Sequence, residues 1–182
     1  KYEKKIENKE RFLGSINFFL NKNLISIINI KPKKKYFHAR FNAKKRIYEY
    51  LIINRTSLLS IDKGKAWHVK KKININLLRK GAKILKGTHD FSTFRASSCT
   101  AKSPIKKMES VIIRKSNEKI YIRFITKSFL QNQVRSMVGC LKYLSIGRWS
   151  ITEFKKVMRS KKRSKCAPPA PAEGLYLMDV KY

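Results

Sequence analysis

Apolar residues recur along this chain with two different periods, and each period predicts a different kind of secondary structure. A spacing of three to four residues places apolar side chains on one face of a helix, whereas continuous or alternating apolar runs are typical of strands. The first pattern predicts helices over residues 12–21, 77–85, 131–144 and 152–159. The second pattern predicts strands over residues 24–30, 48–53, 65–69, 105–114, 119–127 and 175–180.

Turn and cap residues separate these elements. Residues 115–118 predict a hairpin turn between two neighbouring strands. Gly87 and Gly147 are expected to end two of the helices. Thr152 is the predicted N-cap of the last helix, with Glu153 in its first turn, where the helix dipole favours an acid. The remaining stretches predicted to be irregular are residues 88–104, 160–165 and 166–174.

The order of the elements favours one fold class. After residue 36 the chain runs strand, helix, hairpin, two helices and strand, and it contains no internal repeat. That order predicts an α+β fold, in which a mostly antiparallel sheet has helices packed on one face. The basic stretch 31–35, which contains Pro32, is the expected domain boundary.

The charge of the chain indicates a polyanionic partner. The sequence has 44 Lys and Arg residues against 11 Asp and Glu residues, for a formal net charge of +33. A field of that sign makes nucleic acid the first candidate partner. A second explanation stays open, because the cations are mostly Lys and the chain is rich in Ile and Asn, as AT-rich coding would produce without selection for binding. Hydrophobic residues make up 42% of the chain, so we expect it to fold.

Several other functional classes have no signal in the sequence. No apolar run is long enough to span a membrane, and residues 1–11 lack the apolar centre of a signal peptide. Cys99, Cys140 and Cys166 form no metal-binding spacing with the histidines, so we expect no metal site. Such cysteine usage suits a reducing, cytoplasmic compartment. Because the sequence begins with Lys1, we expect it to be a piece of a longer polypeptide.

Residues 37–50 join an aromatic and basic cluster to the start of a predicted strand. Tyr48 and Tyr50 are two residues apart, so on a strand both rings face the same side. Basic groups, including Arg40 and Arg46, precede them and could bind phosphate while a ring stacks on a base. An amphipathic strand with solvated charges around it is the simpler interpretation of the same residues, and both stay open.

The polar segment 87–102 also suits contacts with RNA. It mixes hydroxyl groups and aromatic rings with Arg95 and Lys102, a composition that fits phosphate and sugar contacts. The alternative is a long capped loop pinned by its phenylalanines. Asp90 within it is expected to cap a turn rather than to act as an acid or base with His89.

Residues 129–135 open a predicted helix and contain an unusual charge. Arg135 falls beside the apolar face of that helix. An Arg in this position is usually paired with an acid, and the alternative is that its side chain extends to solvent. The sequence alone does not choose between the two.

A set of motifs runs from residue 37 to the end of the chain. In order they are Phe37-His38-Ala39-Arg40-Phe41, then Arg46-x-Tyr48-x-Tyr50, then Gly87-x-His89-Asp90-Phe91-x-x-Phe94-Arg95-Ala96 with Cys99 and Pro104, then Phe129-x-x-x-x-Val134-Arg135-x-x-Val138-Gly139, and finally Ala167-x-x-Ala170-Pro171-Ala172-Glu173-Gly174-Leu175-Tyr176-Leu177. In order and spacing this set resembles the tRNA pseudouridine synthase A (TruA) family, and as a set it is highly specific. Residues 12–35 look like the helix and strand that precede these motifs in the family.

The resemblance implies an enzyme that isomerises selected uridines of the tRNA anticodon stem-loop to pseudouridine. The family's reaction detaches uracil from ribose, rotates it and rejoins it through carbon 5, with an aspartate at the reaction centre. Such a site flips its target nucleotide out of the stem. The resemblance further implies a homodimer, tRNA as partner, and no cofactor or metal.

The resemblance also assigns roles to single residues. Tyr48 matches the tyrosine that packs against the target uracil, Arg135 matches the arginine that pairs with the catalytic aspartate, and Leu175 matches an apolar residue of the pocket. The positions that match the family's tRNA-contacting stretches are Phe37, His38, Ala39, Arg40, Phe41, Ser98, Cys99, Thr100, Ala101 and Lys102.

One departure from the family is large. The loop that carries the family's catalytic aspartate lies upstream of residue 37, and no such loop occurs here; Asp62, Asp90 and Asp179 stand in other contexts. We therefore expect residues 1–35 to be the tail of an N-terminal domain plus a linker, and residues 36–182 to be the C-terminal domain. The chain alone is expected to be inactive. A truncated tRNA-binding module without activity is the alternative, and a basic ribosomal-type protein is a third possibility that leaves the motifs unexplained.

Overall fold

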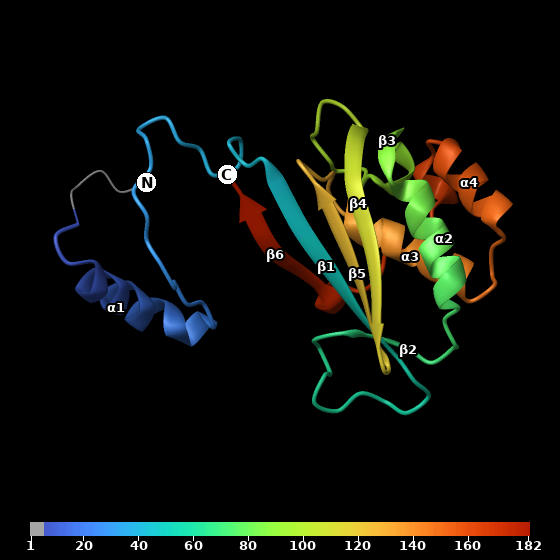
Figure 1. Ribbon diagram of the computed structural model, residues 1–182, viewed down its shortest axis with the longest axis horizontal. Helices are drawn as coiled ribbons and strands as arrows, with labels where there is room; N and C mark the ends of the chain where they lie inside the picture. Colours follow the sequence, from blue (N-terminus) through green and yellow to red (C-terminus); the bar gives the residue numbers. More distant parts are fainter. Residues whose placement is uncertain (1–5) are drawn as a thin grey trace. The chain divides into compact units, whose positions relative to one another are not determined.

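The computed structural model describes residues 6–182 and divides the chain into two compact units (Figure 1). The division falls between Phe41 and Asn42. The domain boundary expected at residues 35 and 36 stays a prediction, because a division into compact units does not identify evolutionary domains.

Over residues 6–41, the described part of the first unit, the chain forms one α-helix, α1 (Lys9–Leu20), followed by a 3₁₀ turn (Asn21–Asn23). The helix predicted at 12–21 is confirmed, and it begins earlier because the side chain of Asn8 caps it, accepting from Arg11 N at 2.9 Å. The strand predicted at 24–30 is wrong. Asn17 provides the reason, since its side-chain amide bonds both the N–H and the C=O of Ile27, at 2.7 and 3.0 Å. These are the groups that a neighbouring strand would otherwise satisfy.

The second unit is built on one sheet, whose mostly antiparallel character confirms the predicted fold class (Figure 1). The strand order is β2-β1-β5-β4-β3, and β6 also pairs with β1; only the β1–β2 pairing is parallel. The long strands β4 and β5 form the predicted hairpin, and its turn contains Asn117 with a positive φ of 51°. The strands are β1 (Lys45–Asn54), β2 (Trp67–Val69), β3 (Gly87–Asp90), β4 (Ile105–Ser116), β5 (Lys119–Thr126) and β6 (Leu175–Lys181).

Two local predictions for this unit are wrong. Residues 88–104 were expected to be irregular throughout, but their first residues belong to β3, which pairs with β4. A short polar edge strand has no apolar alternation to reveal it, and backbone hydrogen bonds alone define it. The N-cap of the last helix is Ser150 rather than Thr152, because Ser150 and Glu153 form a reciprocal capping box, with hydrogen bonds of 3.1 and 2.6 Å.

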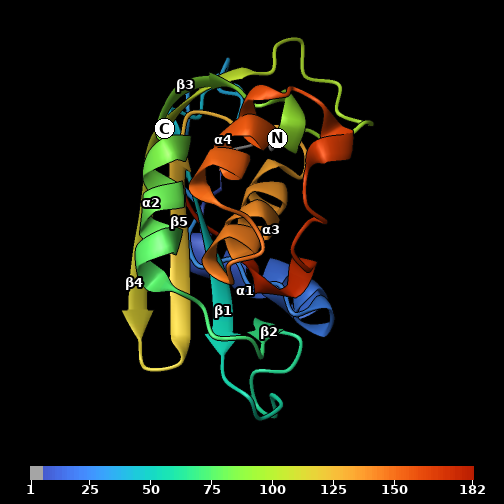
Figure 2. The same cartoon turned by 90° about the vertical axis from the view of Figure 1, so that its right-hand side faces the viewer.

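Three helices cover one face of the sheet, α2 (Ile75–Leu85), α3 (Gln133–Ser145) and α4 (Ile151–Arg159) (Figures 1 and 2). Along β5 the side chains of Ile120, Ile122 and Phe124 are fully buried. Between them lie half-buried residues that include Arg123, whose guanidinium pairs at 2.8 Å with Glu49 of β1. This alternation follows from the two-residue period of a strand, and it directs the core of the unit toward the helices.

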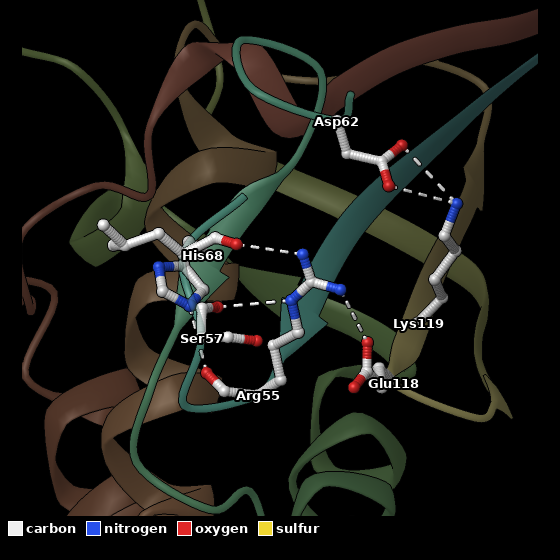
Figure 3. A network of polar contacts seen from close by, with 7 residues as sticks. Arg55, Ser57, Asp62, His68, Glu118 and Lys119 are labelled. Atoms are coloured by element: carbon white, nitrogen blue, oxygen red, sulfur yellow. Dashed lines mark hydrogen bonds and ion pairs between the residues drawn. The ribbon is translucent and has the colours of Figure 1, made fainter. Parts of the chain in front are cut away.

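A polar network fixes the loop that follows β1 (Figure 3). The guanidinium of Arg55 donates to Glu118 at 3.0 Å and to the Leu58 carbonyl at 2.9 Å. Lys119 pairs with Asp62 of the same loop at 3.4 Å. The loop is thus held against the turn between β4 and β5, at the C-terminal end of β1.

Candidate active site

Helix α3 and the segment 166–174 are in direct backbone contact. A Cβ placed on Gly139 of α3 would lie 2.1 Å from the carbonyl oxygen of Pro168, so only glycine allows this approach. One turn earlier, the carbonyl of Arg135 accepts from the N–H of Ala170 at 2.9 Å. This contact explains why two motifs far apart in sequence belong to one site.

The side chain of Arg135 is anchored by the same segment. Its Nε donates to the Ala170 carbonyl oxygen at 2.7 Å. Among residues 6–182 no carboxylate forms an ion pair with Arg135. The side chain is half-buried, so it neither pairs with an acid of the described chain nor extends freely into solvent.

Tyr50 of β1 lies at the centre of this arrangement. Its hydroxyl donates to the Pro171 carbonyl at 2.6 Å, and a Cβ on Gly174 would lie 2.8 Å from its ring. Burial and the nearby charge of Glu173 raise the pKa of Tyr50, and the charge of Arg135 partly opposes them. Arg135 and Glu173 are therefore both electrostatic neighbours of a buried tyrosine that stays protonated.

Tyr48 points to the same side of the sheet as Tyr50, as predicted. The two residues lie opposite Phe124 and Ile122 of β5, which both face the core. Tyr50 is fully buried, whereas Tyr48 is half-buried and meets Phe129 edge to face with a centroid distance of 5.1 Å. Of the two rings, only Tyr48 keeps exposed surface on which a base could stack.

Leu175 is the first residue of β6 and lies opposite Tyr50 in the β1–β6 register. Its side chain packs against the core and is half-buried. Tyr48, Arg135 and Leu175, which sequence reasoning selected separately, are therefore gathered around Tyr50. Their roles in catalysis and substrate binding stay predictions.

The three aspartates of the sequence occupy other places. Asp62 pairs with Lys119 in the loop after β1, and Asp179 lies opposite Ile47 in the sheet. Asp90 caps a turn, as expected, by accepting from Ser92 N at 2.9 Å, and it also pairs with Lys161 at 3.5 Å. None of the three contacts Arg135.

The predicted tRNA-contacting residues 98–102 belong to the second unit. Ser98, Thr100 and Lys102 are exposed, Ala101 is half-buried and Cys99 is buried. Arg95 anchors the segment by donating to the Cys99 carbonyl. The N–H of Ala96 donates to the Gln131 carbonyl at 3.1 Å, which ties the same segment to the residues just before α3.

The predicted tRNA-contacting residues 37–41 belong to the first unit. Phe41 is 73% exposed, and the ring of His38 lies 4.3 Å from it. The Arg40 guanidinium lies 5.9 Å from the Phe41 ring, within cation–π range. Ala39 is exposed and Phe37 is half-buried, with Lys33 over its ring at 5.3 Å. The cluster presents aromatic and cationic groups together.

Sequence reasoning missed the groups that hold the site together. The carbonyls of Ala170 and Pro171 orient Arg135 and Tyr50, but a backbone carbonyl has no signature in sequence. The small residues of the Pro/Ala-rich segment were the available signal, because they permit close backbone approach. Gln133 was also missed: its amide nitrogen is buried and has no partner in the described chain.

Within residues 6–182 no three His, Cys, Asp or Glu side chains are grouped so that they could hold a metal ion. No helix in that range combines the length and apolar character that crossing a membrane requires.

Comparisons with known proteins indicate one family. Residues 82–182 match the family described as tRNA pseudouridine synthase. The chain is 55% identical over 180 residues to the tRNA pseudouridine synthase A of Pelagibacter ubique, a match that covers 99% of this chain and 73% of that protein. It is 39% identical to proteins of the same name from Caulobacter vibrioides, over 93% of this chain and 68% of the relative, and from Maricaulis maris, over 95% and 70%.

Proposed function

This chain belongs to the tRNA pseudouridine synthase family, and we propose that it is the part of such an isomerase that binds tRNA and completes its active site. The substrate is a uridine of the tRNA anticodon stem-loop, and the product is pseudouridine. The catalytic aspartate comes from a segment outside this chain. The observation that carries the proposal is the cluster of Tyr48, Arg135 and Leu175 around Tyr50.

Arg135 holds the incoming aspartate in this proposal. Its Nε is already used by the Ala170 carbonyl, so the fork of the guanidinium is oriented while its terminal nitrogens have no acid partner in residues 6–182. A carboxylate that meets this fork forms a charge-assisted pair of defined geometry. Such a pair keeps the aspartate ionised and aimed at the sugar.

Tyr48 stacks on the flipped uracil, and Leu175 closes the apolar side of the pocket. The edge-to-face contact with Phe129 limits rotation of the Tyr48 ring. A rigid ring suits this reaction, because the detached uracil has to be retained while it rotates. No metal or organic cofactor takes part in the proposed reaction.

The exposed residues of 98–102 and the cluster 37–41 bind the tRNA backbone. They offer hydroxyl groups, cations and aromatic faces, which suit phosphate, sugar and unstacked bases. We place the enzyme in the cytoplasm as a homodimer, on the family resemblance alone.

The test replaces Arg135 in the full-length protein. Arg135→Ala should lower pseudouridine formation by at least about 100-fold, because an ion pair needed in the transition state is lost. The dissociation constant for tRNA should change by less than about threefold. Formation is measured as tritium released from carbon 5 of labelled uridine, and binding is measured by filter retention.

Arg148→Ala is the matched control, since Arg148 follows the same helix, is exposed, and directs its guanidinium to the hydroxyl and ring of Tyr143 rather than to the segment that carries Ala170. It should keep both turnover and binding. An Arg135→Ala protein that turns over normally but no longer binds tRNA would refute the assignment of Arg135.

A tRNA-binding module without activity is the second candidate, favoured by the absence of any contact between Arg135 and the aspartates of residues 6–182. The isolated 182-residue chain distinguishes the two. It should bind tRNA with a steep salt dependence and release no tritium, and addition of the aspartate-bearing segment should restore release. Binding without restored release would favour the module, and a flat salt dependence would contradict use of the charge.

A further inference from the structure

Two cysteines meet where α3 contacts segment 163–171, which runs from the 3₁₀ turn Arg163–Lys165 into the Pro/Ala-rich stretch. Cys140 lies on α3 and is fully buried, while Cys166 lies on the segment and is half-buried. Their Sγ atoms are 3.4 Å apart. A disulfide requires an S–S distance of about 2.05 Å, so a displacement of little more than an ångström joins them.

The surroundings of the pair make one sulfur the nucleophile. The Cys140 thiol and the Arg163 guanidinium lower the pKa of Cys166, against the opposing effect of burial. The Cys166 sulfur and burial raise the pKa of Cys140. Arg163 is held in place by Ser136 of α3, to which its Nη1 donates at 3.0 Å. The more exposed sulfur is thus also the better stabilised thiolate.

We propose that Cys140 and Cys166 form a reversible disulfide when the protein meets a peroxide, and that this bond fastens segment 163–171 to α3. The Cys166 thiolate attacks a peroxide oxygen, the O–O bond breaks, and a sulfenic acid and hydroxide form. The Cys140 sulfur then attacks the Cys166 sulfur, and the S–O bond breaks. Its thiol proton leaves with the departing hydroxide as water. Overall, two thiols and one hydrogen peroxide give one disulfide and two waters.

The bond would act on the candidate active site through the segment. Four residues after Cys166, Ala170 bonds both the backbone and the side chain of Arg135, and Pro171 bonds Tyr50. A shift of the segment toward α3 moves these carbonyls and with them the guanidinium. The effect on turnover rests on the proposed function, whereas formation of the disulfide does not.

The first measurement is the intact mass of the whole chain after treatment with one equivalent of hydrogen peroxide, followed by blocking of free thiols and peptide mapping. The expected product has lost two hydrogen atoms, links Cys140 to Cys166 and leaves Cys99 alkylated. Dithiothreitol should reverse it. The Cys99→Ser protein should form the same link, and Cys166→Ser and Cys140→Ala should not. A Cys166→Ser protein that still loses two hydrogens, or a wild-type product linked between two chains, would overturn the proposal.

Two further readouts separate a fastened segment from an inert bond. The oxidised protein should melt about 5 °C higher than the reduced one, because the bond closes a loop in the unfolded chain. In the full-length enzyme, oxidation should lower kcat several-fold and leave KM for tRNA unchanged. An unchanged melting temperature would overturn the fastening, and unchanged turnover would overturn the link to Arg135. Failure of the proposed function differs from both, because then the reduced protein would also be inactive.

Discussion

Both units contain a helix that apolar periodicity predicts, but none of its apolar side chains is buried in the first unit, whereas some are buried in the second. Helix α1 of the first unit has no buried residue, and Phe18 and Phe19 are 79% and 67% exposed. In the second unit α4 is shorter, yet its Phe154 is 1% exposed. Apolar periodicity therefore predicts that a helix forms, but burial requires a second layer, which α2 and α3 supply for α4 in the second unit.

The comparison can be tested with matched substitutions, because both tryptophans, Trp67 and Trp149, lie in the second unit. Their fluorescence during urea unfolding reports the stability of that unit. Circular dichroism of a peptide spanning residues 6–24 reports the helix of the first unit. Each matched pair of substitutions removes the same kind of feature, a ring, a helical glycine or an N-cap, in both units.

The largest difference is expected for Phe154→Ala against Phe18→Ala. Removal of the Phe154 ring should lower the free energy of unfolding by about 3–5 kcal/mol, since it leaves a cavity in a packed core. Phe18→Ala should change it by less than about 0.5 kcal/mol. Equal losses in the fluorescence transition would mean that α1 also contributes to that unit's stability.

The next pair is Gly139→Ala against Gly14→Ala, two glycines inside helices. Alanine at Gly139 collides with the Pro168 carbonyl and should cost about 1–3 kcal/mol of stability. It should also lower turnover in the full-length enzyme, since the displaced segment carries Ala170. Nothing lies within 4 Å of a Cβ on Gly14, so Gly14→Ala should raise the helical content of the peptide. The reason is that alanine favours the helix over glycine by about 1 kcal/mol. A stable Gly139→Ala protein with normal turnover would contradict the close approach.

The smallest pair concerns the helix caps. Ser150→Ala should cost about 1 kcal/mol of the second unit's stability, because the cap of α4 is lost. Asn8→Ala removes the cap of α1 and should lower the peptide's helicity without moving the fluorescence transition. A shift of that transition by Asn8→Ala would show that the two units unfold together.

Acid should weaken the capping box of α4 in a predictable direction. Hydrogen bonds from the backbone N–H and side chain of Ser150 hold the pKa of Glu153 below its ordinary value of 4.5. A carboxyl with a depressed folded-state pKa stabilises the fold above its unfolded pKa, and this contribution disappears as the pH falls through the folded value. The difference in stability between wild type and Glu153→Gln should therefore shrink below pH 4.5. A difference that grows with acid would contradict the capping box.

Sequence reasoning succeeded where local periodicity and burial agree. The α+β class, the β4–β5 hairpin and the helix 131–144 that became α3 followed from it. It failed for 24–30, where Asn17 satisfies the backbone of an apolar stretch, and for β3, whose polar residues pair only through the backbone. In both cases the deciding partner is a polar group, which apolar patterns do not describe.

The sequence by itself determined the family and the candidate residues, because side-chain types at given spacings are written directly in it. It selected Tyr48, Arg135 and Leu175 without showing that they surround Tyr50. Only the tertiary structure decided that arrangement, since it depends on backbone groups of Ala170 and Pro171 that approach α3 and β1 across Gly139 and Gly174. A hydrogen bond to a backbone carbonyl depends on position rather than residue type, and position is a property of the fold.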